Sequence, residues 1–219
     1  MLGFWNKSVY ITYLGVLSSV LGFIFFIVYK NVDYAFYGAI IAGVCDMFDG
    51  KVARKIPNRT EEEKNFGVEI DSLADIICSI TIPVLTVFLW IFCDYTNTLT
   101  TPNIYMIIIT ALFIVAGIVR LAYFNVAMAD NTKAIKVYTG VPVPASIIAF
   151  GLVWLINHFV GMSINTLQLI YMILVPLMGY LHICKIKVKK LTGNWFYITV
   201  TLVAFISILL TILNRFVFK

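Results

Sequence analysis

The sequence predicts an all-α integral membrane protein, a helical bundle of about seven transmembrane helices, from its composition and from its long apolar runs. Of the 219 residues, 61% are hydrophobic and only 12% are charged, and the mean hydropathy is +0.95. Soluble globular domains carry about 25% charged residues. The composition therefore excludes a water-soluble globular domain, a disordered chain and a nucleic-acid-binding protein. We expect one membrane domain over residues 1–219.

Seven apolar runs are suited to cross a bilayer as helices. A spanning helix needs about 20 mostly apolar residues, whereas barrel strands alternate in polarity over about 10 residues. The runs do not alternate, which favours helices. They cover residues 9–29, 35–53, 67–93, 104–128, 142–160, 166–184 and 195–214. The last run could instead lie at the membrane surface, although its length favours a span.

Basic residues gather where the second, fourth and sixth runs end. They are Lys51, Arg54, Lys55, Arg59, Lys64, Lys133, Lys136, Lys185, Lys187, Lys189 and Lys190. The connections after the third and fifth runs contain no lysine or arginine. Short loops rich in lysine and arginine stay on the cytoplasmic side. We therefore expect a cytoplasmic N-terminus and an external C-terminus. Lys30, Arg215 and Lys219 lie on the side expected to be external and weakly favour the opposite orientation.

The second run carries carboxylates that most of the other runs avoid. An ionised side chain inside a span costs several kcal/mol, so such charges usually mark function. Asp46, Asp49, Gly50 and Ala53 follow one another at i, i+3, i+4 and i+7, which places them on one face of a helix.

The third run repeats this arrangement at i, i+4 and i+8 with Gly67, Asp71 and Asp75. Both stripes approach the same basic connection. An antiparallel pairing of the two helices, at about 1.5 Å per residue, places Asp75 at the depth of Asp46 and Asp71 at the depth of Asp49. The sequence therefore predicts that four carboxylates converge, within a two-helix catalytic region over residues 35–80.

Four converging carboxylates would repel one another unless cations lie between them. Oxygen ligands without a nearby histidine or cysteine pair suit Mg²⁺, Mn²⁺ or Ca²⁺ rather than zinc or copper. Four carboxylates suffice for two such ions, and two ions about 4 Å apart clamp phosphoryl oxygens in displacement reactions. Gly50, Ala53 and Gly67 remove bulk from the same faces and leave room for a ligand.

These residues carry a resemblance to a known family. The pattern Asp46-x-x-Asp49-Gly50-x-x-Ala53-Arg54, followed by Gly67-x-x-x-Asp71-x-x-x-Asp75, resembles the CDP-alcohol phosphotransferases. The resemblance implies a six-helix membrane core, here with an added C-terminal span, and an enzyme that displaces CMP with the help of two divalent cations. These are Mg²⁺ or Mn²⁺, with Ca²⁺ as a substitute. One departure is the gap of twelve residues between Arg54 and Gly67, which is longer than usual.

Three stretches resemble the phosphatidylserine synthase branch of that family in bacteria and archaea. They are residues 58–76, 120–125 and 140–145. The resemblance implies transfer of a phosphatidyl group from CDP-diacylglycerol to the hydroxyl of L-serine, which yields phosphatidylserine and CMP. It further implies a homodimer in a prokaryotic cell membrane, with the active site facing the cytoplasm.

The resemblance also implies roles for the motif residues. The metal ligands are Asp46, Asp49, Asp71 and Asp75. The CDP and pyrophosphate site is lined by Asp46, Gly50, Ala53, Arg54, Gly67 and Asp71. Asp75 is the matching position for the general base that accepts the serine proton.

Arg120 is an intramembrane cation at about the depth of the aspartates. We expect it to bind the lipid phosphate or the serine carboxylate, since a guanidinium suits such oxyanions; the alternative is a structural partner for an aspartate. We expect Asn125 to support it. Arg59 and Lys64 either gather anionic substrate or only set the topology. Thr60 and Glu63 have the spacing of a capping box at the start of the third helix.

Two alternatives remain open from the sequence. Another CDP-alcohol phosphotransferase, which uses glycerol phosphate or inositol phosphate or makes archaetidylserine, would share all four aspartates. A divalent-cation transporter would also place acidic residues in spans. Against the transporter, the aspartates lie near one end of two helices, and the sequence contains no inverted repeat.

Overall fold

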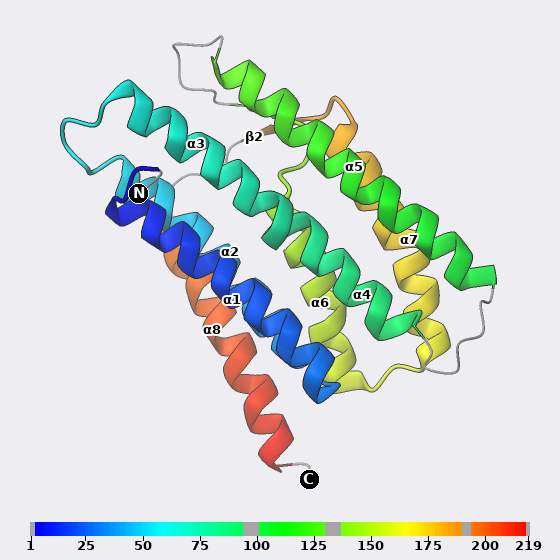
Figure 1. Ribbon diagram of the computed structural model, residues 1–219. Helices are drawn as coiled ribbons and strands as arrows, with labels where there is room; N and C mark the ends of the chain where they lie inside the picture. The colour runs from blue at the N-terminus through cyan, green and yellow to red at the C-terminus, as the bar shows by residue number, and fades with distance from the viewer. Residues whose placement is uncertain (1–2, 94–100, 130–136, 190–193, 218–219) are drawn as a thin grey trace.

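Figure 1 shows a computed structural model of the chain, in which long helices lie side by side in a bundle. The structure describes residues 3–93, 101–129, 137–189 and 194–217. Its helices are α1 (Lys7–Tyr29), α2 (Asp33–Ala53), α3 (Glu61–Asp75), η1 (Ile76–Thr81), α4 (Ile82–Ile91), α5 (Thr101–Ala129), α6 (Pro144–Val160), α7 (Ile164–Ile183) and α8 (Asn194–Val217). The prediction of an all-α membrane protein is confirmed, because each predicted apolar run forms a helix or a continuous helical segment.

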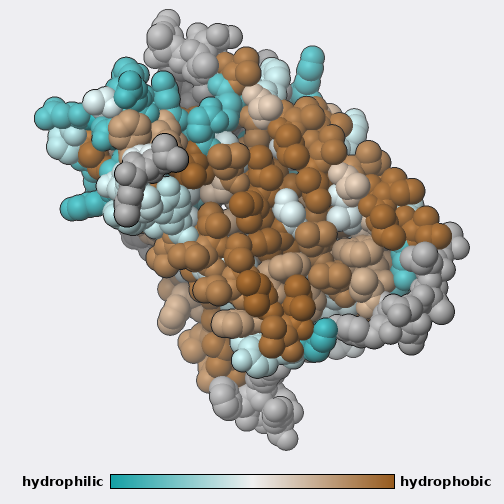
Figure 2. Space-filling model, viewed as in Figure 1, coloured by the Kyte–Doolittle hydropathy of each residue, from teal (hydrophilic) through white to brown (hydrophobic). Residues whose placement is uncertain are grey.

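Among the described residues, four helical segments are long and apolar enough to cross a membrane. They are Lys7–Tyr29, Glu61–Ile91, Asn103–Ala127 and Ile164–Ile183. The second of these joins α3, η1 and α4 into one run, with the π-helical turn η1 in its middle. Helix α6 is apolar but shorter. Figure 2 shows a broad hydrophobic surface across the middle of the molecule and hydrophilic residues gathered at one end.

Helices α1 and α2 form a tight antiparallel hairpin. A β-carbon on Gly22 or Gly38 would collide with the backbone of the other helix, so both positions need glycine. The Ser18 hydroxyl also donates to the Gly38 carbonyl across the hairpin at 3.2 Å. This close approach brings the side chains of α1 directly onto the face of α2 that carries the aspartates.

Aromatic residues mark both ends of α1. The Trp5 ring contacts Tyr10 and Tyr13 at centroid distances of 6.0 Å and 5.7 Å, and Tyr29 contacts Tyr34 at 5.7 Å near the other end. From Tyr10 to Tyr29 the helix rises about 29 Å, which matches a hydrocarbon core of about 30 Å. Aromatic side chains favour membrane interfaces, so α1 has the length and the end residues of a full span.

The start of α1 and the end of α8 lie at opposite ends of the bundle (Figure 1). This agrees with an odd number of crossings. The side of the membrane on which each end lies stays a prediction. Lys133 and Lys136, two of the loop cations behind that prediction, lie outside the described residues.

Two elements were not expected from the sequence. The π-helical turn η1 begins directly after Asp75. A short antiparallel ribbon pairs β1 (Val137–Thr139) with β2 (Lys187–Lys189). The ribbon joins the connection before α6 to the connection after α7, at the end of the bundle where α5 and α7 finish (Figure 1).

Candidate metal centre

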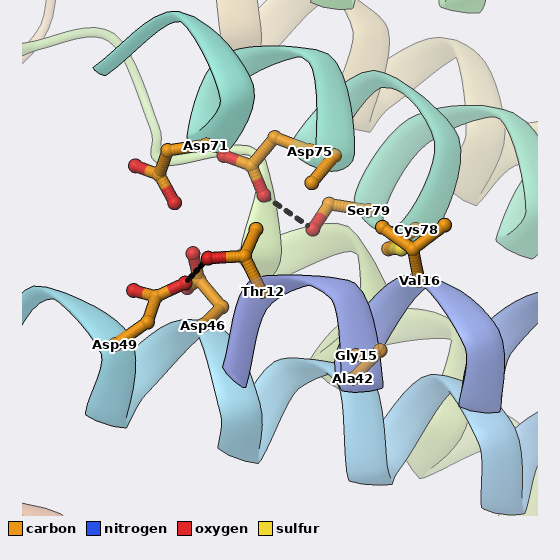
Figure 3. Close-up of a pocket in the computed structure, with 11 residues that line it drawn as sticks. Thr12, Gly15, Val16, Ala42, Asp46, Asp49, Asp71, Asp75, Cys78 and Ser79 are labelled. Atoms are coloured by element: carbon orange, nitrogen blue, oxygen red, sulfur yellow. Dashed lines mark hydrogen bonds between the residues drawn. The ribbon is translucent and has the colours of Figure 1, made fainter. Parts of the chain in front are cut away.

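Three carboxylates from two helices meet in one small volume. Asp46 and Asp49 of α2 and Asp71 of α3 each place an oxygen so that all three atoms lie within 4.8 Å of one another. Asp49 is buried, and the other two are partly buried. Figure 3 shows these side chains pointing toward one another across the gap between the two helices. The structure thus brings the two predicted aspartate stripes together.

Asp75 lines the same pocket as this group of three. Ser79, one turn later on η1, donates a hydrogen bond to Asp75 Oδ1 at 2.8 Å (Figure 3). The sequence predicts that four carboxylates converge, and in the structure all four line one pocket. The π-helical turn follows Asp75 immediately, and such turns are frequent at functional sites.

The group of three fits a divalent cation. Two ligands of one ion are at most two metal–oxygen bond lengths apart, about 4.2 Å for Mg²⁺ and about 5 Å for Ca²⁺. The observed spread of up to 4.8 Å lies within or close to these limits. Three carboxylates without a thiolate or imidazole in the group select a hard cation such as Mg²⁺, Mn²⁺ or Ca²⁺. The residues present therefore suit the cations that the sequence predicts.

Small side chains leave space beside the carboxylates. The pocket holds about 260 Å³ of space between atoms, including space open to solvent. Gly15 of α1, Ala42 of α2 and Ala74 of α3 each line it. Its other lining residues are Thr12, Val16, Asp46, Asp49, Asp71, Asp75, Cys78 and Ser79.

Helix α1 contributes to this site, and the sequence did not predict this contribution. The Thr12 hydroxyl donates to Asp49 Oδ2 at 2.6 Å. One sequence feature indicates that α1 packs closely against another helix: it has a stripe of small and polar residues at spacings of three or four. The buried members of this stripe are Ser8, Thr12, Gly15, Ser19 and Gly22.

Two arginines lie over the glycines of the predicted nucleotide site. A β-carbon on Gly67 would lie 2.8 Å from Arg59 Nη2, and one on Gly50 would lie 3.6 Å from Arg54 Nη1. Arg59 donates to the carbonyl of Ala53 at 3.4 Å and to that of Glu63 at 2.9 Å. Arg59 therefore fastens the end of α2 to the start of α3. Arg54 is exposed.

Lys64 lies at the surface and pairs with Glu61 at 2.7 Å. The predicted capping box is confirmed: Thr60 accepts from the Glu63 backbone, and the Glu63 carboxylate accepts from the Thr60 backbone. Both features belong to the solvated first turn of α3. This placement favours the interpretation of Lys64 as a topological charge.

Arg120 of α5 is buried, with 7% of its surface exposed. Its guanidinium carbon lies 5.3 Å from the centroid of the Phe124 ring. The charge is also close enough to Asp75 to act on its carboxylate electrostatically. Arg120 is thus on the Asp75 side of the site.

Asn125 has a hydrogen-bond partner on α3 that the sequence did not predict. Its amide nitrogen donates to the Ser72 hydroxyl at 2.9 Å, and its amide oxygen lies 3.1 Å from the same hydroxyl. The side chain thus joins α5 to α3, one residue from Asp71. The expectation that Asn125 supports Arg120 stays a prediction beside this contact between helices.

Comparisons with known proteins agree with the geometry. A family model described as CDP-alcohol phosphatidyltransferase matches residues 5–210. Proteins named CDP-diacylglycerol–serine O-phosphatidyltransferase, from two strains of Helicobacter pylori, are 29% identical over 154 residues, or 69% of this chain. One of the same name from Saccharomyces cerevisiae is 32% identical over 114 residues, which are 49% of this chain and 37% of that protein. The chain spans 60% of the length of the bacterial relatives.

Proposed function

This chain belongs to the CDP-alcohol phosphatidyltransferase family, and from that premise we propose that it transfers the phosphatidyl group of CDP-diacylglycerol to L-serine. The products are phosphatidylserine and CMP. The observation that carries the proposal is the group of Asp46, Asp49 and Asp71, with Asp75 beside it in one pocket. The choice of serine is supported by the names of the similar proteins.

In the proposed reaction the serine hydroxyl oxygen attacks the phosphorus that carries diacylglycerol. A new P–O bond forms to the serine oxygen. The P–O bond to CMP breaks, and its electron pair stays on the oxygen of the departing CMP. The serine proton passes to the Asp75 carboxylate. A general base at the right distance contributes about 10²–10⁴-fold to a rate. Ser79 holds one oxygen of Asp75 and so fixes the orientation of that carboxylate.

Asp46, Asp49 and Asp71 would hold a divalent cation, and Asp75 would help to hold a second. When bound, Mg²⁺ or Mn²⁺, with Ca²⁺ as a substitute, neutralises charge on the phosphoryl oxygens and on the departing CMP. What remains for the protein is to align the attacking and leaving oxygens.

Arg54, exposed over Gly50, would bind the CDP pyrophosphate at the mouth of the pocket. Ala53 and Gly67 would line the same site. Arg59, bound to backbone carbonyls of α2 and α3, would set the spacing of its walls. Arg120 would bind the serine carboxylate or the lipid phosphate on the Asp75 side.

The depth of the site suits a lipid substrate. Thr12, which contacts Asp49, is two residues along α1 from Tyr10 in the aromatic group at its start. The carboxylates therefore lie near the edge of the hydrocarbon layer, where a CDP headgroup meets water while its acyl chains stay in the leaflet. We propose that this edge faces the cytoplasm of a prokaryotic cell and that the protein works as a homodimer.

The test is an assay of the purified protein in lipid nanodiscs. Radiolabelled serine, CDP-diacylglycerol and Mn²⁺ or Mg²⁺ should yield labelled phosphatidylserine and equal amounts of CMP. Glycerol phosphate and inositol phosphate, offered in place of serine, should release no CMP. A labelled product with either of these, and none with serine, would assign the chain to another activity of the family.

The family match favours a transferase over the divalent-cation transporter. A flux assay in proteoliposomes separates the two functions. The transferase releases CMP without net Mn²⁺ flux, whereas Mn²⁺ flux without CMP release would support the transporter.

A further inference from the structure

Helix α1 supplies no carboxylate to the candidate metal centre, yet it reaches one of the ligands. The Thr12 hydroxyl is 2.6 Å from Asp49 Oδ2. Both residues are buried, with 7% of Thr12 and 5% of Asp49 exposed. The contact joins helices that are 37 residues apart in the sequence. Figure 3 shows the hydroxyl of Thr12 on α1 directed at an oxygen of the Asp49 side chain.

The hydroxyl has one proton and two acceptors within reach. The carbonyl of Ser8, on the same helix, is 3.3 Å away, and the carboxylate of Asp49 is 2.6 Å away. A hydroxyl that donates to a carboxylate forms a bond of about 2.5–2.7 Å, which is about twice as strong as a bond between neutral groups. The proton of Thr12 is therefore directed to Asp49.

The bond depends on how closely α1 and α2 approach. Gly15 lies one turn beyond Thr12, and a β-carbon there would come within 3.1 Å of the Cys45 β-carbon. A short threonine side chain bridges the two helices only because the small residues of the interface allow this approach. The hydrogen bond between Thr12 and Asp49 is therefore part of the buried packing between α1 and α2.

We infer that Thr12 is a positioning residue for Asp49, which makes α1 a third helix of the metal centre. The hydrogen bond fixes the rotation of the Asp49 carboxylate and leaves its other oxygen for a cation. Residues that orient metal ligands typically contribute about 10–100-fold to metal affinity. This inference rests on the proposed divalent-cation centre.

The experiment measures Mn²⁺ binding by the full chain in nanodiscs without substrates, from the electron paramagnetic resonance signal of free Mn²⁺. Thr12→Val keeps the shape of the side chain and removes the hydroxyl. It should weaken Mn²⁺ binding by at least about tenfold. Thr12→Ser keeps the hydroxyl and should bind within about threefold of the wild-type affinity.

Thr110→Val is the matched control, because Thr110 is also a buried threonine and its hydroxyl has no hydrogen-bond partner among the described residues. It should bind Mn²⁺ as the wild type does. Thermal melting of each variant checks that it is folded, and Thr12→Ala compared with Thr12→Ser replaces the valine variant if that variant unfolds.

Two results would overturn the inference while the metal centre stands: wild-type affinity in folded Thr12→Val or Thr12→Ala, or equal losses in the serine variant and the variant without a hydroxyl. A wild-type protein that binds no Mn²⁺ would instead remove the centre itself, and the inference with it.

Discussion

Helix α2 carries buried carboxylates at both ends, and their surroundings differ. At one end, Asp33 accepts a hydrogen bond from Trp154 Nε1 at 3.0 Å. The Trp154 ring stacks on Phe36 with centroids 4.9 Å apart. At the other end, Asp49 meets two further aspartates beside a pocket lined by glycine and alanine.

The difference shows what distinguishes a structural carboxylate from a candidate ligand. Around Asp33 large aromatic rings fill the space, and the indole N–H of Trp154 donates a hydrogen bond to the buried carboxylate oxygen. Around Asp49 the small residues Gly15, Ala42 and Ala74 leave space beside the carboxylates. These buried carboxylates carry like charges, so they repel one another unless cations lie between them. The same residue type in one helix thus takes two roles, according to the volume and charge that its neighbours supply.

The strongest test of this comparison replaces one carboxylate from each kind of environment. Asp75→Asn should lower turnover by about 10²–10⁴-fold, because the amide cannot accept the serine proton. Mn²⁺ and CDP-diacylglycerol binding should be partly retained. Asp33→Asn is the matched control and should turn over at the wild-type rate per folded molecule. The radiolabelled serine assay measures both, and normal turnover in Asp75→Asn would remove this residue as the base.

Arg120→Ala should raise the KM for serine or for CDP-diacylglycerol by about 10–100-fold, since hydrogen bonds to charged groups contribute about 1.5–3 kcal/mol. Arg120→Lys should recover part of the loss because it keeps the charge. Steady-state kinetics with each substrate varied in turn will identify which oxyanion Arg120 binds. Unchanged KM values for both substrates would leave Arg120 as a scaffold residue.

Trp154→Phe probes the structural end of α2. The substitution removes the indole donor to Asp33 and leaves a buried carboxylate oxygen without that bond, which should cost about 1–3 kcal/mol of stability. Thermal denaturation in detergent should show the lower melting temperature, while turnover per folded molecule stays at the wild-type value. Lost turnover in the folded variant would show that the two ends of α2 are not independent.

Gly67→Ala tests the packing of Arg59 at the site. The added β-carbon would lie 2.8 Å from Arg59 Nη2, so the guanidinium must move. We expect the KM for CDP-diacylglycerol to rise about three- to tenfold, a change of about 0.6–1.4 kcal/mol. Gly151→Ala is the control, because a β-carbon there meets open space. Equal kinetics in the two variants would contradict a role for this contact in substrate binding.

Lys64→Ala should have the smallest effect. Its ion pair with Glu61 is exposed, and such pairs contribute about 0–1 kcal/mol. Turnover, both KM values and the melting temperature should match those of the wild type. A raised KM for CDP-diacylglycerol would instead give Lys64 a part in gathering the substrate.

Much of the structure of this protein could be predicted from the periodicity and composition of its sequence alone. The long apolar runs predicted the helices, because a bilayer requires about 20 such residues for each crossing. The spacing of Asp46 with Asp49 and of Asp71 with Asp75 predicted two acidic faces, because a helix repeats every 3.6 residues. The capping box at Thr60 and Glu63 was also predictable, since both partners lie within one turn.

Contacts between distant helices were decided only by the tertiary structure. The sequence contains Thr12 and Asp49, but only the glycine-mediated approach of α1 to α2 brings the hydroxyl to the carboxylate. The π-helical turn after Asp75 and the hydrogen bond from Ser79 to that carboxylate are likewise features of the folded structure that the sequence did not predict. Helical spacing fixes which residues share a face, whereas the distance between two faces depends on the side chains that pack between them.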